Sequence, residues 1–196
     1  MNCVVLAAGL GTRLRPLTNK TPKPAIIIKG KPIIRHVLDW LEDVGFDDIL
    51  VKAHYLANQV KKAIGKDENV KFITESKLSP TAYFLKKNKD KLEDEFLVTN
   101  GDTLTDLDLL DFIEFHMVNK NIATVFTKHD AIHSGGTYIF DKEVLKYIRE
   151  DMDIPDLMKS LIDKNILVNL YFSDAIYFDT ATHEKLEKAQ RLWKLK

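Results

Sequence analysis

Short apolar runs alternate with longer stretches of helical spacing along most of the chain. The apolar runs are short enough to be buried strands and lie at residues 2–7, 48–53, 70–74, 96–99 and 122–127. Between them, apolar side chains recur at the spacing of one helix face, which predicts helices at residues 33–41, 55–64, 81–92 and 108–119. Strands and helices that alternate in this way form a mostly parallel sheet with helices on both faces. The pattern therefore predicts an α/β, three-layer α/β/α, Rossmann-like fold.

The last third of the chain is less regular. It predicts strands at residues 136–140 and 168–172, and helices at residues 141–150, 155–164 and 182–193. No proline-rich or low-complexity linker divides the sequence, and it contains no internal repeat. We therefore expect residues 1–196 to form a single domain.

Two polar segments directly follow predicted strands. The segment "GLGTRLRPLTNKTPKP" occupies residues 9–24 after the first strand, and "NGDT" occupies residues 100–103 after the fourth. In open α/β sheets, ligands bind beyond the carboxyl ends of the strands. The two segments are therefore expected to contribute to one site.

Composition and charge exclude several classes of function. Lys plus Arg and Asp plus Glu both total 29, so the basic excess of a nucleic-acid-binding protein is absent. No apolar stretch approaches the length of a membrane span, and the apolar run at residues 3–8 lacks the basic leader of a signal peptide. Cys3 is the only cysteine, which favours a reducing, cytoplasmic location. His129 and His133 are interpreted as loop residues rather than as part of a zinc site.

The glycine-rich segment has the chemistry of a phosphate-binding loop. Backbone N–H groups around Gly9 and Gly11 can bind phosphate oxygens beyond a strand end, and Arg13 and Lys23 add two cations. The dinucleotide-binding fingerprint fails because Leu14 stands where its third glycine should be, and the Gly-Lys-Ser/Thr of a nucleoside-triphosphatase loop is absent. The alternative is a tight strand-to-helix connection with solvated cations. The glycines and both cations together favour the phosphate interpretation.

The stretch "LAAGLGTRLRPLTNKTPKP" resembles the N-terminal signature of the sugar-1-phosphate nucleotidylyltransferases, almost continuously from Val4 to Pro24. The resemblance implies a nucleotide-diphospho-sugar transferase type of fold and transfer of a nucleotidyl group to a sugar phosphate with release of pyrophosphate. It implies that Arg13 binds the β- and γ-phosphates, and that Lys23 neutralises charge around the α-phosphate and contacts the substrate. The nucleotide-binding residues implied by this segment are Leu6, Ala7, Ala8, Gly9, Gly11, Thr12 and Arg13.

Two aspartates are expected to hold Mg²⁺, which prefers one or two carboxylates together with phosphate oxygens and water. Asp102 follows a strand in "VTNGDT", and Asp179 precedes the final helix in "IYFDTATHEKLEKA". The family resemblance places metal-binding aspartates at both positions, and Asp102 also among the nucleotide-binding residues. Each also has a structural interpretation, Asp102 as a turn residue and Asp179 as a residue favoured near a helix N-terminus.

The later part of the chain departs from the family pattern. The family's base-reading segment, Glu-x-x-Leu-Gly-Thr-x-Gly, corresponds to "ESKLSPTAYFLK", in which Glu75, Leu78 and Thr81 match but Ser79, Pro80 and Tyr83 replace small flexible residues. The resemblance implies that Glu75 and Thr81 bind the nucleotide. The long excursion that carries the family's acceptor-phosphate lysine is missing, and "KHDAIHS" takes its place. "SGGTYIF" resembles the family's glycine-tyrosine strand beside the sugar, which makes Gly135 a predicted substrate contact.

The leading hypothesis is a Mg²⁺-dependent enzyme that joins a nucleoside triphosphate to a sugar 1-phosphate. One alternative is a cytidylyltransferase for phosphocholine or another alcohol phosphate, for which Tyr83, Tyr138, Tyr171 and Tyr177 are candidate contacts to a quaternary amine. The other is a non-catalytic, nucleotide-binding regulatory protein of the same fold. A homodimer is compatible with the resemblance. The sequence itself leaves the base and the sugar open.

Overall fold

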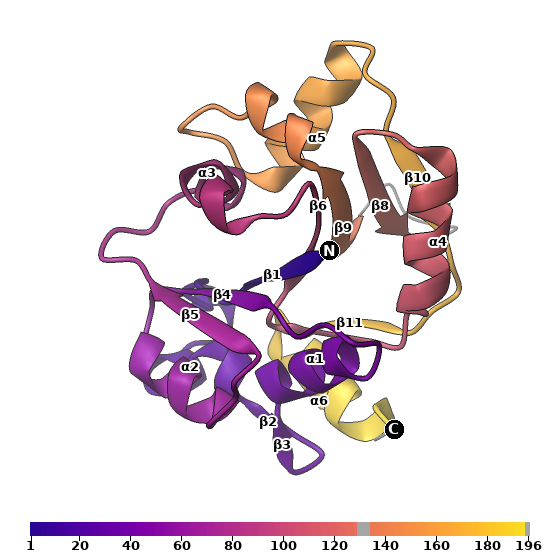
Figure 1. Ribbon diagram of the computed structural model, residues 1–196. Helices are drawn as coiled ribbons and strands as arrows, with labels where there is room; N and C mark the ends of the chain where they lie inside the picture. Colours follow the sequence, from indigo (N-terminus) through magenta and orange to yellow (C-terminus); the bar gives the residue numbers. More distant parts are fainter. Residues whose placement is uncertain (129–133, 195–196) are drawn as a thin grey trace.

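A seven-stranded sheet forms the centre of the computed structural model, which describes residues 1–128 and 134–194 (Figure 1). The strand order is β10-β8-β9-β6-β1-β4-β5. The strands are β1 (Asn2–Leu6), β4 (Ile49–Ala53), β5 (Val70–Thr74), β6 (Glu95–Asn100), β8 (Ala123–Thr127), β9 (Ser134–Asp141) and β10 (Asn169–Phe172). Only β9 runs against its neighbours in this sheet; it pairs antiparallel with β6 and β8, and the other pairings are parallel. The prediction of a mostly parallel sheet is confirmed, whereas His129 and His133 lie outside the described residues.

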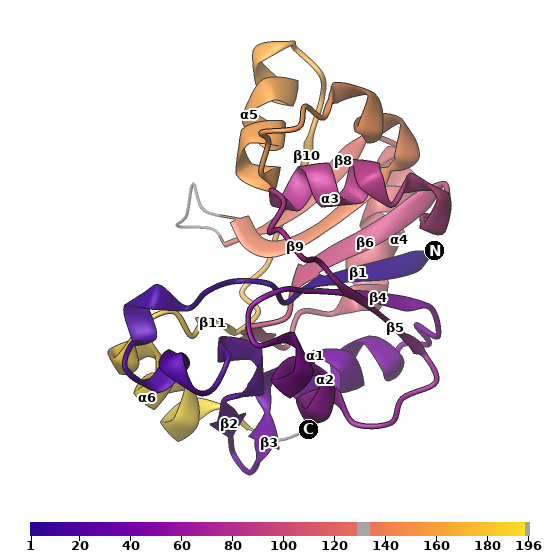
Figure 2. The ribbon, with the colours of Figure 1, turned by 90° about the vertical axis from the view of Figure 1, so that its left-hand side faces the viewer.

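Helices cover both faces of the sheet, as predicted (Figures 1 and 2). Alternate side chains of β1 point to opposite faces: Val4 joins a core with α3 (Thr81–Lys87) and α5 (Ile154–Asp163). Val5 joins a second core with α1 (Ile33–Glu42), α2 (Ala57–Ile64) and α4 (Leu109–Asn119). Both side chains are fully buried, so β1 forms the middle of the fold.

A third, smaller core lies beyond the sheet edge and supports the glycine-rich segment. Side chains from β2 (Ile27–Ile28), β7 (Thr103–Thr105), β11 (Tyr177–Asp179) and α6 (His183–Leu192) meet in this core. β2 pairs antiparallel with β3 (Lys31–Pro32), and β7 pairs antiparallel with β11. Leu14 packs in this cluster with Leu104 and Trp193. The sequence pattern did not predict these strands, because two or three residues are too few to show a period.

Two predicted helices differ from the structure. Residues 141–150 were expected to be helical, but only Lys142–Tyr147 forms a 3₁₀ helix, which begins where the Asp141 carboxylate accepts the Glu143 N–H at 2.6 Å. The predicted helix at residues 81–92 ends at Lys87, because the Asn88 side chain bonds back to the Phe84 carbonyl at 2.9 Å, and a 3₁₀ turn follows at Lys89–Lys91. Within the described residues, every helix is too short or too polar to cross a bilayer.

Candidate active site

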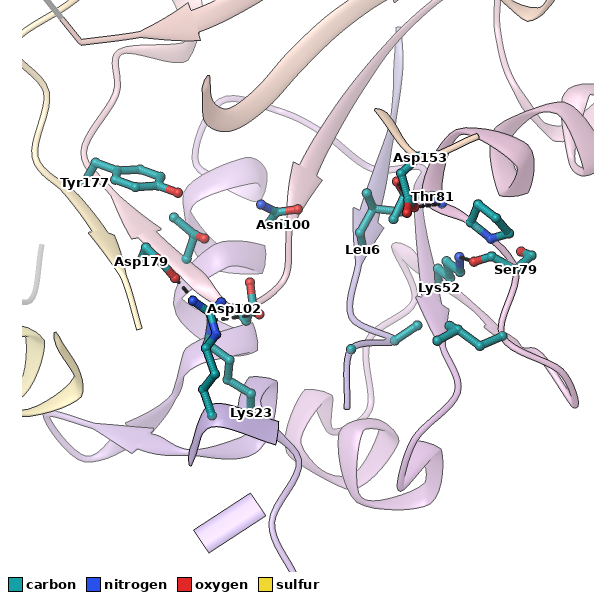
Figure 3. Close-up of a pocket in the computed structure, with 16 residues that line it drawn as sticks. Leu6, Lys23, Lys52, Ser79, Thr81, Asn100, Asp102, Asp153, Tyr177 and Asp179 are labelled. Atoms are coloured by element: carbon teal, nitrogen blue, oxygen red, sulfur yellow. Dashed lines mark hydrogen bonds and ion pairs between the residues drawn. The ribbon is translucent and has the colours of Figure 1, made fainter. Parts of the chain in front are cut away.

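The carboxyl ends of three neighbouring strands open into a cavity of about 600 Å³ (Figure 3). Leu6 on β1 is paired in register with Lys52 on β4 and with Asn100 on β6, and all three residues line the cavity. The glycine-rich segment leaves β1 at this level, and "NGDT" leaves β6. The cavity therefore lies where the sequence placed the site.

The two glycines of the loop have different roles. Gly11 has a φ of +61°, and a Cβ there would lie 2.9 Å from Thr18 Cγ2, so the turn itself requires glycine. Its carbonyl accepts a hydrogen bond from the Thr18 hydroxyl at 2.7 Å. Gly9 lines the cavity, and a Cβ there would meet nothing within 4 Å. The backbone at Gly9 is thus open to close approach by a ligand, as phosphate binding by backbone N–H groups requires.

Asp102 and Asp179 converge on one buried ammonium group. Lys23 Nζ lies 3.0 Å from Asp102 Oδ2 and 3.5 Å from Asp179 Oδ1, although Lys23 and Asp179 are 156 positions apart in the chain. The pairing of β7 with β11 sets Asp179 opposite Thr103, the residue after Asp102. Thr180 strengthens this connection by donating a hydrogen bond to the Asp102 carbonyl at 2.8 Å. Two distant carboxylates therefore face the same position.

Lys23 is held at this position by its backbone. Lys23 stands between Pro22 and Pro24 and begins the 3₁₀ turn Lys23–Ala25. In this turn, the Ala25 N–H donates to the Pro22 carbonyl at 2.8 Å. Prolines fix their own φ and so restrict the turn. The side chain is buried, with Asp102 and Asp179 as its ion-pair partners. The ammonium group is consequently pre-positioned beside both carboxylates.

Asp179 has a second cationic partner on α6. Lys185 Nζ lies 2.8 Å from Asp179 Oδ2. Burial raises the pKa of Asp179, but the hydrogen bond from Lys185 and the charge of Lys23 outweigh burial and lower this pKa below its ordinary value. Arg13 completes the set of cations: it lines the cavity, is exposed, and forms no ion pair within the described part of the chain. Its guanidinium is therefore available to an anionic ligand.

The opposite end of the cavity is built around a buried lysine. Lys52 is only 1% exposed, and its Nζ donates to the Ser79 carbonyl at 2.6 Å and pairs with Glu75 Oε2 at 3.3 Å. Burial lowers the pKa of Lys52, and the charge of Glu75 opposes that change. The Glu75 carboxylate also accepts the Ser79 hydroxyl at 2.6 Å and the Ser79 N–H at 3.3 Å. Glu75 thus shapes the cavity wall through Ser79, and it does not itself line the cavity.

Thr81 and Asp153 form the rim above Lys52. Asp153 Oδ1 accepts the Thr81 N–H at 2.6 Å and the Thr81 hydroxyl at 2.8 Å. The Ile154 N–H donates to Thr81 Oγ1 at 2.9 Å. These bonds join the N-termini of α3 and α5, and both Thr81 and Asp153 line the cavity.

The structure brings together most of the residues predicted from the sequence. Those that line the cavity are Leu6, Ala8, Gly9, Arg13, Lys23, Thr81, Asp102 and Asp179. Those outside its lining are Ala7, Gly11, Thr12, Glu75 and Gly135. Gly135 lies on β9, where a Cβ would be 2.2 Å from Phe126 Cδ1, so packing against this ring explains the glycine.

Sequence reasoning did not name two of the lining residues, Lys52 and Asp153, whereas Ser79, Asn100 and Tyr177 belong to segments or alternatives that it had considered. Lys52 carried a usable signal, because a single lysine in an otherwise apolar strand must find partners when the strand is buried. Asp153 lies in the segment "MDIPDLMKSLI", which resembles the family stretch that supplies a sugar-contacting acid, but the sequence did not decide which acid. Of the four tyrosines considered for a quaternary amine, Tyr177 alone lines the cavity.

Comparisons with known proteins agree with the fold and with the family that the N-terminal segment resembles. A family model described as "Nucleotidyl transferase" matches residues 2–135. Bifunctional protein GlmU of Methanocaldococcus jannaschii is 29% identical over 208 residues, which cover 89% of this chain and 51% of the relative. UTP–glucose-1-phosphate uridylyltransferase of Synechocystis is 32% identical over 160 residues, which cover 72% of this chain and 41% of the relative. The chain thus spans about half or less of the length of these curated relatives.

A solved structure of similar length gives the same result. HddC from Yersinia pseudotuberculosis superposes with a TM-score of 0.81 at 25% identity, over 98% of this chain and 99% of that chain. A second structure of HddC is a complex with GMP-PN, at the same TM-score and identity. The family model covers more than half of this chain, and the sheet, the glycine-rich loop and the paired aspartates are all present. The chain belongs to the nucleotidyl transferase family, among the sugar-1-phosphate nucleotidyltransferases.

Proposed function

We propose that this chain transfers a nucleotidyl group from a nucleoside triphosphate to a sugar 1-phosphate, giving a nucleoside diphosphate sugar and pyrophosphate. The observation that carries the proposal is the convergence of Asp102 and Asp179 on Lys23, beside Arg13 and the open backbone of Gly9. The relative from Synechocystis bears the name of such an enzyme, and HddC has been solved with the nucleotide analogue GMP-PN. Both support a site for a nucleotide in this cavity.

The donor set fits a divalent cation. Two carboxylates already face one cationic group, and Mg²⁺ prefers one or two carboxylates with the remaining positions taken by phosphate oxygens and water. Within residues 1–128 and 134–194, no group of three or more His, Cys, Asp and Glu side chains could form an all-protein metal site. Asp102 and Asp179 would hold Mg²⁺, which would offset the negative charge of the phosphates and of the leaving pyrophosphate.

The reaction needs positioning and charge stabilisation more than covalent help. The sugar phosphate oxygen attacks the α-phosphorus, and the bond from the α-phosphorus to the bridging oxygen of pyrophosphate breaks. Arg13 is free to bind the leaving β- and γ-phosphates. Lys23, held between the two aspartates, stabilises charge that develops around the α-phosphate. The loop at Gly9 orients the phosphates through its backbone.

Release of pyrophosphate tests the proposal. Nucleoside triphosphates are combined in a grid with sugar 1-phosphates and phosphocholine, with Mg²⁺ and with a chelator. Turnover is expected with a sugar 1-phosphate, lost with chelator, and lowered about a hundredfold or more in Asp102→Asn. Asp174→Asn, an exposed aspartate in the segment before β11, is the matched control and should retain wild-type turnover.

Each other outcome has a defined meaning. Wild-type turnover in Asp102→Asn would show that the proposed role of the paired aspartates is wrong. Turnover with phosphocholine alone would favour the cytidylyltransferase alternative. Nucleotide binding with no release of pyrophosphate across the grid would favour a regulatory protein of this fold. Cytoplasmic location and assembly into a homodimer remain predictions.

A further inference from the structure

The charged end of the cavity is formed by Arg13, Lys23, Asp102 and Asp179. The chain segments that carry these residues also build the third core. Arg13 lines the cavity, and the next residue, Leu14, lies in the core. On β7, Thr103 lines the cavity and Leu104 lies in the core, because side chains alternate between the two faces of a strand. The third core is therefore the back wall of the charged end.

The same alternation on β11 places Asp179. Tyr177 and Asp179 line the cavity (Figure 3), and Phe178 between them packs against the third core. β11 is three residues long and pairs with β7 in a separate two-stranded sheet. A pair of strands this small is only marginally stable without packing on one face. The packing of Phe178 therefore decides where the Asp179 carboxylate lies.

Trp193 packs against Phe178 from the far side of the core. It directly follows α6, which lies beside β11 (Figures 1 and 2), and it is 9% exposed. Its ring meets the Phe178 ring edge to face, with centroids 6.3 Å apart and ring planes at 84°. Aromatic rings prefer this arrangement, which adds to the stabilisation from burial. Trp193 thus supports the strand that carries Asp179.

Two hydrogen bonds hold the Trp193 indole in place. Its Nε1–H donates to His36 Nδ1 at 3.4 Å, and His36 Nε2 donates to the Ile28 carbonyl at 2.9 Å. A carbonyl only accepts, so the proton of the neutral imidazole lies on Nε2 and Nδ1 is the acceptor. Burial lowers the pKa of His36, which favours this neutral form. The indole is therefore anchored to α1 and β2 while it packs on β11.

We propose that Trp193 is a positioning residue that fixes the Asp179 carboxylate through Phe178. The inference rests on the proposed function, in which Asp179 holds Mg²⁺ at the phosphates. In such a site, a displacement of about 1 Å can cost up to about a hundredfold. Loss of the Trp193 ring should therefore weaken the binding of a magnesium-bound phosphate, and the loss of stability alone should not.

Inorganic pyrophosphate with Mg²⁺ probes the charged end without a choice of base and without turnover. Its dissociation constant is obtained by titration calorimetry of the full chain, at a temperature where a thermal melt shows each variant to be folded. Trp193→Leu should bind the probe about tenfold more weakly than the wild type. Trp193→Phe keeps an aromatic ring beside Phe178 and should bind it within about threefold of the wild type.

The matched control is Phe112→Leu. It replaces a fully buried aromatic ring on α4, a helix that contributes no residue to the described lining of the cavity. This variant should lose stability and bind the probe like the wild type. Phe178→Leu removes the same ring contact at a side chain that is only partly buried. It should reproduce the weaker binding, and it keeps the test decisive if Trp193→Leu does not fold.

Two double variants separate the positioning of Asp179 from general damage to the site. In Asp179→Asn the positioned carboxylate is gone, so adding Trp193→Leu should weaken binding of the probe by less than about twofold. Arg13 lies on another segment, so in Arg13→Met the effect of Trp193→Leu should remain about tenfold.

The two proposals fail separately. Unchanged binding in Trp193→Leu or Phe178→Leu would overturn the role of Trp193, and so would equal weakening in Phe112→Leu, in Trp193→Phe or in the Asp179→Asn background. None of these results bears on pyrophosphate release by the wild type. Weaker probe binding in Trp193→Leu, with no turnover by the wild type, would contradict the proposed function and leave the role of Trp193 standing. If the wild type did not bind the probe, both proposals would be wrong.

Discussion

The Lys52→Met substitution tests whether the buried lysine holds the cavity wall. Methionine keeps most of the length and volume of the side chain and removes the ammonium group. In the variant, the Ser79 carbonyl loses its donor at 2.6 Å, and Glu75, with a side chain only 6% exposed, loses its ion-pair partner at 3.3 Å. The loss leaves a buried carboxylate without its principal opposite charge.

Removing one partner of a buried ion pair typically costs about 3–5 kcal/mol. The cost here should lie near the lower end, because Glu75 keeps its bonds from Ser79 and its pair with Lys87 at 3.5 Å. A loss of about 3 kcal/mol corresponds to a fall in Tm of about 6–12 °C for a chain of this size. Lys87→Met is the matched control, since Lys87 pairs with the same carboxylate but is 47% exposed. This control should cost less than about 1 kcal/mol.

Urea unfolding followed by circular dichroism and by tryptophan fluorescence gives the free energy of unfolding of each variant. The double variant Lys52→Met/Glu75→Gln should recover at least about 1 kcal/mol relative to Lys52→Met alone, because glutamine removes the uncompensated charge and can still accept from Ser79. The reasoning is refuted if Lys52→Met costs no more than Lys87→Met, or if the second substitution restores nothing.

Three further predictions concern Glu75, Gly135 and Lys185. Burial raises the pKa of Glu75, but hydrogen bonds from Ser79 and the charge of Lys52 hold this pKa below its ordinary value. The ionised Glu75 therefore stabilises the fold fully above its unfolded pKa of about 4.3, and this stabilisation is lost as the pH falls further. Between about pH 5 and pH 3, the free energy of unfolding should fall less in Glu75→Gln than in the wild type, and equal falls would contradict the prediction. Gly135→Ala should destabilise the fold by about 1–3 kcal/mol, because the new Cβ would lie 2.2 Å from Phe126 Cδ1; a raised KM for the sugar phosphate with an unchanged Tm would instead support the predicted substrate contact. Lys185 pairs with Asp179 Oδ2 at 2.8 Å and would compete with Mg²⁺ for this carboxylate. In Lys185→Met, the Mg²⁺ concentration for half-maximal pyrophosphate release should therefore fall severalfold, while the free energy of unfolding changes by less than about 1 kcal/mol. An unchanged or higher Mg²⁺ midpoint would argue against this competition.

The sequence by itself determined the α/β architecture and the place of the site. Strand–helix alternation depends on local periodicity, which is visible in one chain without any contact. The loop at residues 9–24 could be predicted for the same reason, because its glycines, prolines and cations lie close together in the sequence. The structure agrees with this prediction, since Gly11 has a positive φ and the Cβ position of Gly9 is open.

The tertiary structure alone decided which distant side chains share the site. Asp179 reaches Lys23 because two strands of three residues, β7 and β11, pair across the chain, and strands this short leave no periodic signal. The orientation of β9 and the packing of Gly135 against Phe126 likewise depend on pairing between strands. Asp153 lies at the cavity rim because its carboxylate accepts the N–H and the hydroxyl of Thr81, 72 positions earlier in the chain. Such features arise from contacts between residues far apart in sequence, so local pattern does not encode them.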